Sequence, residues 1–376
     1  MSATPRISDL TVRLVNDASG FEALESDWNR LSGDVPFRNH RWHRTWWHHF
    51  GGEHKLLILA VYDQETCVGI APLFVQRVFA AGRVAQFLGS GVVASDQQTI
   101  LADSGDTEDV GRAVARWFAS EKNMHADLLQ LDGIDVTCPA FAAFSSAAKQ
   151  NGYSLVDRST LHTWRIALPA NTDAYLAMLS KSCRRKIRTA MKRFESGELN
   201  VSIANDKATF QQTWDCFVDL HQRRRESQGE DDSFADTTFT GFLHDIAGQF
   251  FDAGNLDMVC VSSNEGPIAT EICFRSRTCS YAYQIGINPD SLKDNPGWLV
   301  NAASIQRAIE LGLTHFDFCR GDFDYKRQMG ADPIVCQRLR IVPPRFRSQV
   351  LGAVITQGTA MRNFLQSRFS VTSNQS

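Results

Sequence analysis

The alternation of apolar and polar residues predicts two amphipathic helices at the start of the chain. Apolar side chains recur at helical spacing over residues 21–31, and again over residues 42–50, where Trp42, Trp46 and Phe50 fall on one face. Two glycines follow the second segment, as is common where a helix ends. The chain therefore opens with two helices that each bury one face.

Two apolar runs then predict a β-hairpin. They cover residues 55–61 and 68–74 and are separated by a short polar turn. Further along, residues 110–118 have helical spacing, and residues 127–131 have the composition of a buried strand. This part of the chain thus reads as helices, a hairpin, a helix and a strand.

The same order of elements occurs a second time. A shift of 200 residues (261 − 61) places Val61 on Val261 and Phe74 on Phe274, and a shift of 190 (317 − 127) places residues 127–128 on 317–318. Matching order and spacing predict an internal duplication of one α/β unit. The predicted parts are a first module (1–160), a second module (161–345), and a C-terminal helix with a tail (346–376).

Composition fits a folded chain of about two domains. The 376 residues are 43% hydrophobic and 22% charged, so there is ample apolar material for ordered cores. Lys and Arg number 39 and Asp and Glu number 42, which gives a formal net charge of −3. This balance argues against a uniformly basic protein that coats nucleic acid, and any recognition by charge must be local.

Cysteine spacing and hydropathy predict a soluble protein in a reducing compartment. The nine cysteines are odd in number and show no C-x-x-C or zinc-finger spacing. No stretch of roughly 20 residues is apolar enough to span a membrane, and the first residues lack a signal-peptide pattern. We therefore expect a cytoplasmic protein with no metal site, no membrane span and no nucleic-acid partner.

A basic segment provides the first candidate site. Residues 181–193 contain seven basic residues and no acid, and their apolar members recur at helical spacing, with Ser182 as a candidate cap. Arginine side chains on a helix can bind phosphates or carboxylates through paired hydrogen bonds, which predicts an anion site. The alternatives are a solvated surface helix with no ligand, or a helix that binds a membrane surface or a nucleic acid. Residues 221–226 form a second cationic patch. The candidate anion-binding residues are Arg184, Arg185, Arg188, Arg223 and Arg224.

A strand, loop and helix provide the second candidate site. Residues 280–287 alternate as a strand in which Gly286 indicates a bulge or the close approach of a ligand, and residues 298–311 have helical spacing. Pro296 and Gly297 open that helix. Its free N–H groups and positive dipole end are suited to a pyrophosphate, although Pro and Gly also begin helices for capping alone.

The third candidate site is the segment after the next strand. Residues 314–319 form that strand, and Asp322, Tyr325 and Lys326 follow it, at the strand end where α/β sites usually lie. Lys326 suits a developing oxyanion or a phosphate, and Tyr325 suits proton transfer; a turn with exposed charges is the alternative. Glu271 lies within an apolar strand and is either a buried general base or an outward-facing residue.

The histidines of residues 40–54 lack the spacing of metal ligands. We expect them to form the polar face of an aromatic helix, and they receive no functional role.

Several segments together resemble a known family. The order FLGSG, KSCRRKIRTAMKRF, LHQRRRE, GPIATEICFR, NPGWLV and FDFCRGDFDYKRQMG resembles the CelD/BcsL (cellulose biosynthesis) group of GNAT-superfamily acyltransferases, which is similar to the Fem peptidyltransferases. The resemblance covers about residues 20–340. It implies an α/β (α+β) fold of tandem GNAT-like modules, each a mixed twisted sheet flanked by helices, with the acyl-donor site in the second module.

The resemblance also implies roles for individual residues. Lys326 corresponds to the lysine of a Phe-Lys pair and would stabilise the tetrahedral intermediate, and the arginines of the basic helix would face an anionic acceptor. Asp322 is a further candidate for substrate binding. The loop before the helix departs from the Gln/Arg-x-x-Gly-x-Gly/Ala pattern of GNAT enzymes. The resemblance therefore supports acyl transfer as the reaction more strongly than acetyl-CoA as the donor. The residues expected to bind acyl-CoA are Ile285, Gly286, Pro296, Gly297, Trp298 and Leu299.

These expectations define an acyltransferase. The acyl group would pass from acyl-CoA, most simply acetyl-CoA, to an amine or hydroxyl of a sugar nucleotide or polysaccharide precursor, while Glu271 or His221 removes the acceptor's proton. A Fem-like transferase that uses aminoacyl-tRNA is one alternative. A non-catalytic GNAT-like protein that binds an anionic sugar nucleotide or a biosynthetic partner is the other.

Overall fold

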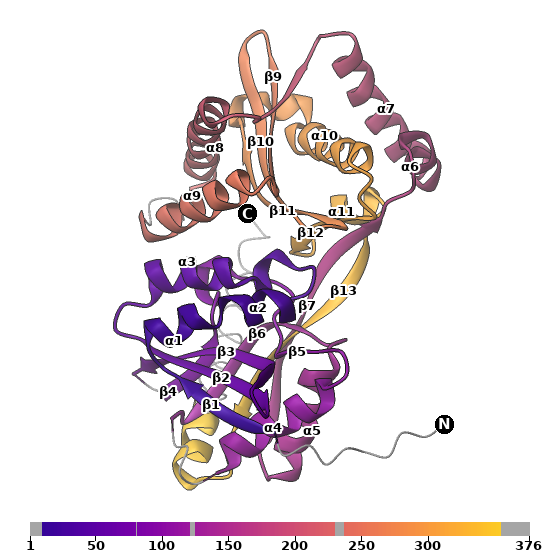
Figure 1. Ribbon diagram of the computed structural model, residues 1–376. Helices are drawn as coiled ribbons and strands as arrows, with labels where there is room; N and C mark the ends of the chain where they lie inside the picture. The colour runs from indigo at the N-terminus through magenta and orange to yellow at the C-terminus, as the bar shows by residue number, and fades with distance from the viewer. Residues whose placement is uncertain (1–9, 80, 121–124, 230–236, 355–376) are drawn as a thin grey trace, which may run out of the picture.

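The computed structural model describes residues 10–79, 81–120, 125–229 and 237–354, which form two α/β modules (Figure 1). The first module contains β1 (Thr11–Val15), α1 (Ala18–Ala23), α2 (Glu25–Leu31), η1 (Pro36–Arg38), α3 (His40–Phe50), β2 (Lys55–Asp63), β3 (Thr66–Val78), β4 (Gly82–Phe87), η2 (Gly91–Val93), β5 (Leu101–Ala102), α4 (Thr107–Ala119), β6 (Leu128–Asp135), α5 (Pro139–Gln150) and β7 (Ser154–Ala167). The second contains α6 (Thr172–Met178), α7 (Lys181–Glu195), β8 (Asn200–Ile203), α8 (Lys207–Gln228), α9 (Thr237–Asp252), β9 (Leu256–Ser263), β10 (Gly266–Arg275), β11 (Cys279–Ile287), η3 (Pro289–Asp294), α10 (Pro296–Glu310), β12 (His315–Arg320), α11 (Asp324–Gln328) and β13 (Asp332–Val342).

The predicted order of elements is present in both modules. The hairpin β2–β3 of the first module corresponds to β9–β10 of the second, α4 corresponds to α10, and β6 corresponds to β12. The first predicted helix, residues 21–31, is divided at Leu24, where one helix ends and the next begins. The mixed α/β fold with two similar modules is therefore confirmed.

The two modules share one sheet. Its strands lie in the order β1-β2-β3-β4-β6-β13-β7-β12-β11-β10-β9-β8. β13, the last strand of the second module, pairs with β6 of the first, and β7, the last strand of the first, pairs with β12 of the second. The module boundary predicted at residues 160/161 thus falls within β7, and the two long strands β7 and β13 run between the modules in Figure 1.

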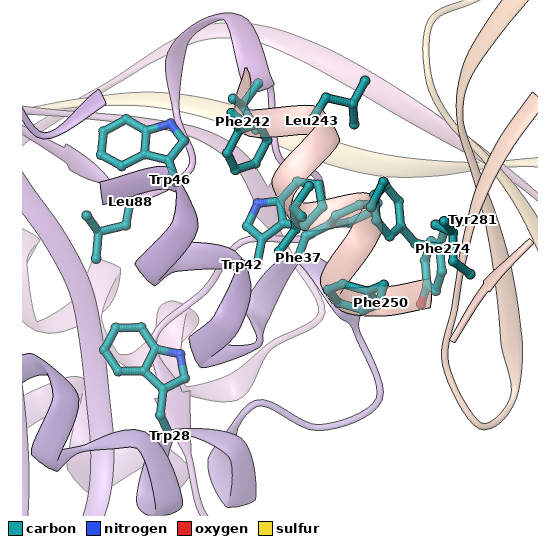
Figure 2. Packing of buried hydrophobic residues seen from close by; sticks show 14 of the residues in the cluster. Trp28, Phe37, Trp42, Trp46, Leu88, Phe242, Leu243, Phe250, Phe274 and Tyr281 are labelled. Atoms are coloured by element: carbon teal, nitrogen blue, oxygen red, sulfur yellow. The ribbon is translucent and has the colours of Figure 1, made fainter. Parts of the chain in front are cut away.

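An aromatic core joins the modules. Trp42 from α3 contacts Phe242 from α9 and Phe274 from β10 edge-on, with ring centroids 5.3 and 5.2 Å apart. Figure 2 shows these rings together with Phe37 and Tyr281, so side chains from both modules fill one space. Because large aromatic side chains bury much apolar surface, this contact makes the two modules a single packed unit.

Two of the histidines assigned to a polar helix face lie in this core instead. His40 and His43 are 1% and 0% exposed, and burial lowers the pKa of His43 to about 3. A neutral imidazole packs against the tryptophan rings here, with ring centroids of Trp28 and His43 5.4 Å apart. The prediction of a polar face was therefore wrong for these two residues.

The apolar pattern predicts the C-terminal helix over residues 350–369, and in the structure this helix starts earlier. Residues 346–354 are helical, and Leu351 packs on the turn between β3 and β4. The remainder of the predicted helix, residues 355–369, lies outside the described residues. Within the described ranges, no helix is both long and apolar enough to cross a bilayer.

Candidate active site

The parallel strands β11 and β12 separate along their length. Only three consecutive residue pairs join them, and the pairing ends at Tyr281 and Asp317, although β11 continues to Ile287 and β12 to Arg320. The strands therefore open toward their C-terminal ends, the edge at which α/β proteins usually bind ligands. The opening exposes backbone groups of β11 that no neighbouring strand uses on that side.

Lys326 holds the end of β12. It is 2% exposed, and its Nζ donates to the carbonyl oxygens of Phe318, Cys319 and Arg320 at 3.0, 3.1 and 2.8 Å. An ammonium group has three hydrogens to donate, and all three are used here. The oxyanion role remains a prediction that requires Lys326 to release one of these carbonyls.

Glu271 faces helix α10 from the middle of β10. Its side chain is 3% exposed, so the alternative of an outward-facing residue was wrong. Burial raises the pKa of Glu271 to about 7, and the nearby Ser304 hydroxyl only partly offsets this shift. Within the described residues, neither Glu271 Oε2 nor Ser304 Oγ makes a hydrogen bond of normal geometry. A carboxyl group with this pKa can accept a proton near neutral pH.

The other two predicted catalytic residues lie apart from each other. Tyr325 stacks on Phe323, with ring centroids 6.1 Å apart, and burial together with the charge of Glu271 raises the pKa of its hydroxyl. His221 is buried on α8, which covers the opposite face of the sheet from α10. The structure therefore brings Tyr325 near Glu271, and it does not bring His221 to them.

The start of α10 and the basic helix α7 line one pocket of about 270 Å³. Arg185, Lys186 and Arg193 contribute from α7, and Lys293, Asp294 and Trp298 contribute from the other side. Asp294 pairs with Arg193 at 3.1 Å, so Arg185, Lys186 and Lys293 supply the excess positive charge. The Nζ of Lys186 lies 4.6 Å from the centre of the Trp298 ring, which is a cation–π distance. Two candidate sites that are more than 100 residues apart in the sequence, the basic helix and the Pro-Gly helix start, thus form one cationic pocket.

The α10 start has the geometry of an anion site. Asn295 precedes the helix in the left-handed conformation and makes no side-chain hydrogen bond to the first turn. Gly297 has open space beside it, because a Cβ there would meet only Ile287 Cδ1 at 3.8 Å. Pro296 and Leu299 are buried and anchor the turn. The N–H groups of Trp298 and Leu299 donate to Asn295 O at 2.9 and 3.3 Å, so the N–H of Gly297 is the group that can face a ligand.

Not all of the predicted arginines are available for a substrate. Arg184 donates to the carbonyls of Leu176, Ala177 and Leu179 at 2.8 to 3.1 Å, and so closes the end of α6. Arg188 is exposed, and no carboxylate of the described residues lies within ion-pair distance of it. The helix is capped by the preceding Ser180, whose Oγ accepts from Cys183 N, and the cap prediction at Ser182 was wrong.

The second cationic patch is partly neutralised. Arg223 on α8 donates to Asp290 at 2.6 Å and to Asn288 at 3.1 Å, which ties α8 to the loop before α10. Arg224 is half-buried on the same helix. A structural role for Arg223 is therefore visible, and substrate binding by either residue stays a prediction.

Gly286 makes room for a helix. A Cβ at this position would lie 2.8 Å from Thr270 Oγ1 and 2.9 Å from the carbonyl oxygen of Phe217 on α8. The strand irregularity lies at Tyr283 instead, since Ile272 pairs with Gln284 and the next residue pairs with Ala282. Ile285 lies opposite Glu271, on the face that α10 covers.

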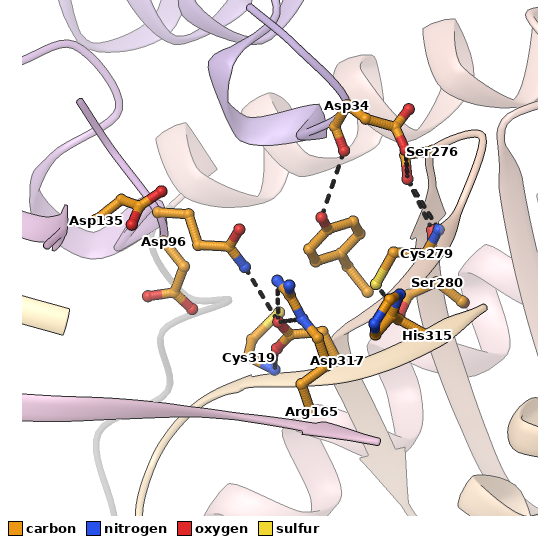
Figure 3. A network of polar contacts seen from close by, with 12 residues as sticks. Asp34, Asp96, Asp135, Arg165, Ser276, Cys279, Ser280, His315, Asp317 and Cys319 are labelled. Atoms are coloured by element: carbon orange, nitrogen blue, oxygen red, sulfur yellow. Dashed lines mark hydrogen bonds and ion pairs between the residues drawn. The ribbon is translucent and has the colours of Figure 1, made fainter. Parts of the chain in front are cut away.

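A buried polar network between the modules was missed at the sequence level. Asp317 accepts hydrogen bonds from Arg165 and from Gln97 of the first module, each at 3.0 Å (Figure 3). Asp96 accepts from Arg320 Nε at 2.6 Å and from its backbone N–H at 2.9 Å. Burial raises the pKa of Asp317 to about 6, and Arg165 opposes this shift. The loop at residues 95–99 is entirely buried, yet a run of polar residues reads as a surface loop.

Asp322 lies beside this network on the surface. It accepts from Trp164 Nε1 at 3.0 Å and lies 3.3 Å from His162 Nδ1, and the bond from Trp164 lowers the pKa of Asp322. The side chain is therefore held against β7, just after the end of β12. Its role toward an acceptor stays a prediction.

The corresponding helix of the first module has the opposite charge. The first turn of α4 contains Glu108 and Asp109, which pair with Arg112 at 3.1 and 2.9 Å. Carboxylates at a helix start repel a phosphate. The cationic pocket is thus a feature of the second module. Among the described residues, no group of three or more His, Cys, Asp or Glu side chains is placed to hold a metal ion.

Comparisons with known proteins agree with this arrangement. Residues 181–327 match the family model described as an acetyltransferase (GNAT) domain. The match includes α7, the strand opening and the α10 pocket. No match was found among curated proteins. Residues 181–327 of the second module therefore form a GNAT acetyltransferase domain, and this match supports a GNAT-type acyltransferase.

Solved structures share the two-module fold at low sequence identity. The crystal structure of FemX is 12% identical, with a TM-score of 0.61, over 84% of this chain and 95% of that one. L-PGS from Bacillus licheniformis is 10% identical, with a TM-score of 0.52, over 90% and 96%. A tandem GNAT protein from the clavulanic acid biosynthesis pathway is 10% identical, with a TM-score of 0.50, over 88% and 98%. These similarities extend the GNAT-like fold to both modules.

Proposed function

We propose that the protein transfers an acyl group from acyl-CoA, most simply acetyl-CoA, to an amine or hydroxyl of a sugar nucleotide or polysaccharide precursor. The observation that carries the proposal is the cationic pocket at the start of α10, in a module whose strands β11 and β12 separate toward their C-terminal ends. The acceptor class follows from the sequence resemblance to the CelD/BcsL group.

The donor fits this arrangement in two parts. One of its phosphates would lie at the N–H of Gly297, within reach of Arg185, Lys186 and Lys293. Its pantetheine arm would then extend into the strand opening, where the free edge of β11 offers backbone hydrogen bonds. The thioester carbonyl would reach the region of Tyr325 and Glu271.

Acyl transfer would proceed by direct attack in a ternary complex. The acceptor nitrogen or oxygen bonds to the thioester carbon, the tetrahedral intermediate collapses, and the C–S bond breaks to release the CoA thiolate. Glu271 takes the proton that the acceptor loses, directly or through water, and Tyr325 donates a proton to the thiolate. Backbone N–H groups of β11 stabilise the oxyanion, with Lys326 when it releases a carbonyl.

A matched pair of variants tests the donor site. Arg185 lines the α10 pocket, whereas Arg188, one turn further along α7, lines only the outer surface of that helix. Titration calorimetry should show that Arg185→Gln weakens acetyl-CoA binding about tenfold, while Arg188→Gln leaves it unchanged. No binding of any acyl-CoA by the wild type would refute the proposal.

One observation favours a second candidate, a Fem-like transfer from aminoacyl-tRNA. Lys181, Arg185, Arg188 and Lys192 form an exposed stripe on α7, with no described carboxylate in ion-pair contact with them. Such a stripe suits a polyanion. Tight, salt-sensitive binding of aminoacyl-tRNA without acyl-CoA binding would support this candidate. Binding of a sugar nucleotide without turnover of any donor would support a non-catalytic role.

A further inference from the structure

One end of the first module exposes an unusual number of large apolar side chains. Val78 and Phe79 at the tip of the β3–β4 hairpin are 37% and 109% exposed. Phe346, Val350 and Val354 on the C-terminal helix are 88%, 46% and 50% exposed. These five are nearly half of the exposed large apolar side chains in the described chain, and we call them the apolar tip.

The two elements that form the apolar tip lie side by side. Leu351 packs on Ala81, Val84 and Leu128, and a Cβ on Gly82 would meet Leu351 Cδ1 at 3.3 Å. Figure 1 shows this part of the chain at the end of the first module away from the second module. The apolar tip is therefore remote from the strand opening and from the α10 pocket.

The exposed helix residues form one face. Phe346, Val350 and Val354 are four residues apart, so they stack along one side of the helix. The other side packs on the protein, because Ser348 is buried and a Cβ on Gly352 would lie 3.0 Å from Val342 Cγ2. An apolar face that points away from the core indicates a contact with another surface.

Arginines surround the apolar tip. Arg77 and Arg83 are direct cross-strand partners behind the hairpin tip, and Arg345 and Arg347 flank Phe346. Like charges that face each other across a sheet destabilise it unless an anion lies nearby. Arg83 and Arg347 share the buried carboxylate of Asp127, which they contact at 3.3 and 3.7 Å. The excess is thus cationic.

We propose that the apolar tip docks the protein on an anionic lipid bilayer. Aromatic and aliphatic side chains at the tip would enter the boundary between headgroups and acyl chains, while the arginines behind them contact lipid phosphates. A bilayer fits better than a second protein copy, because four like-charged arginines around the tip would repel each other across a twofold interface. The active site would face away from this contact and stay open to substrates.

Vesicle flotation with the full chain tests this proposal. Vesicles of equal parts phosphatidylglycerol and phosphatidylcholine should retain the wild type, whereas pure phosphatidylcholine vesicles, or about 0.5 M NaCl, should lower the bound fraction about tenfold. The variant Phe79→Ser/Phe346→Ser should also lose binding about tenfold. Met178→Ser, which alters an exposed apolar residue on the second module, is the control and should bind like the wild type.

A second measurement uses a fluorescent residue at the tip. Phe79→Trp should show a blue-shifted emission when phosphatidylglycerol vesicles are added, because the indole enters a less polar layer. Equal retention on both vesicle types, or equal loss in Met178→Ser, would overturn the proposal. A wild-type dimer in sedimentation velocity that the double serine variant makes monomeric would overturn it in favour of a contact between copies.

Discussion

The variant Gly297→Asp tests whether the start of α10 binds a ligand or is only a structural helix start. Gly297 is the second residue of α10, and its added side chain would meet only Ile287 Cδ1 at 3.8 Å. The first turn of α10 contains no acidic residue. An aspartate there suits the helix dipole and replaces a glycine within a helix, so folding should be stabilised by about 1 kcal/mol.

The same variant should bind a phosphate more weakly than the wild type. A carboxylate about 5 Å from one phosphate charge, at an effective dielectric constant of about 20, costs about 3 kcal/mol, since 332/(20 × 5) is about 3.3. Acetyl-CoA affinity should therefore fall by on the order of a hundredfold, and the loss should shrink as salt is added.

Two assays on the same protein give the answer. Thermal unfolding should show Gly297→Asp at least as stable as the wild type, while calorimetry shows the loss of acetyl-CoA binding. Gly297→Asn is the matched control of equal size without charge, and its affinity should fall far less than that of the aspartate variant. Wild-type affinity in a folded Gly297→Asp protein would refute the placement of phosphates at this helix start.

Three further predictions concern buried charges. Burial raises the pKa of Glu271 to about 7, so the folded state holds a proton that the unfolded state releases near pH 4.5. The contribution of this group to the free energy of unfolding is fully present below pH 4.5, and about 3 kcal/mol of it is lost as the pH rises through about 7. Urea unfolding at several pH values should show this decrease in the wild type and not in Glu271→Gln. The same decrease in Glu271→Gln would contradict the assignment. Lys326→Met leaves three carbonyls without donors and should destabilise the fold by about 3 kcal/mol, so a stable variant with lost turnover would instead indicate a chemical role. Asp96→Ala leaves Arg320 without its carboxylate and should cost about 3 kcal/mol in denaturant unfolding, whereas a change below about 1 kcal/mol would show that the pair is not stabilising.

The repeated pattern was enough to predict most of the fold. Hairpins, helices and strands that align at a shift of about 200 residues are local features, because hydrophobic periodicity reports which side of an element is buried. The pairing of β7 with β12, and of β13 with β6, was not predictable in this way. Both strands belong to their own modules in sequence, and only long-range pairing places β13 beside β6.

Those parts of the candidate site that lie within a single sequence segment were predictable. The helix start at Pro296 and the cationic face of α7 are visible as local motifs, but their common pocket depends on packing between α7 and α10. Arg184 looked equivalent to Arg185 because neighbouring arginines have the same chemistry. Their directions differ by about 100° on a helix, so one closes α6 while the other lines the pocket.

Equilibrium dialysis with radiolabelled acetyl-CoA tests the central claim most directly. We expect one molecule bound per chain, because the start of α10 is cationic while the corresponding start of α4 contains Glu108 and Asp109. Excess unlabelled acetyl-CoA should displace the bound label. Two molecules per chain would contradict the assignment of the donor site to the second module, and no binding would contradict the acyl-CoA-dependent function itself.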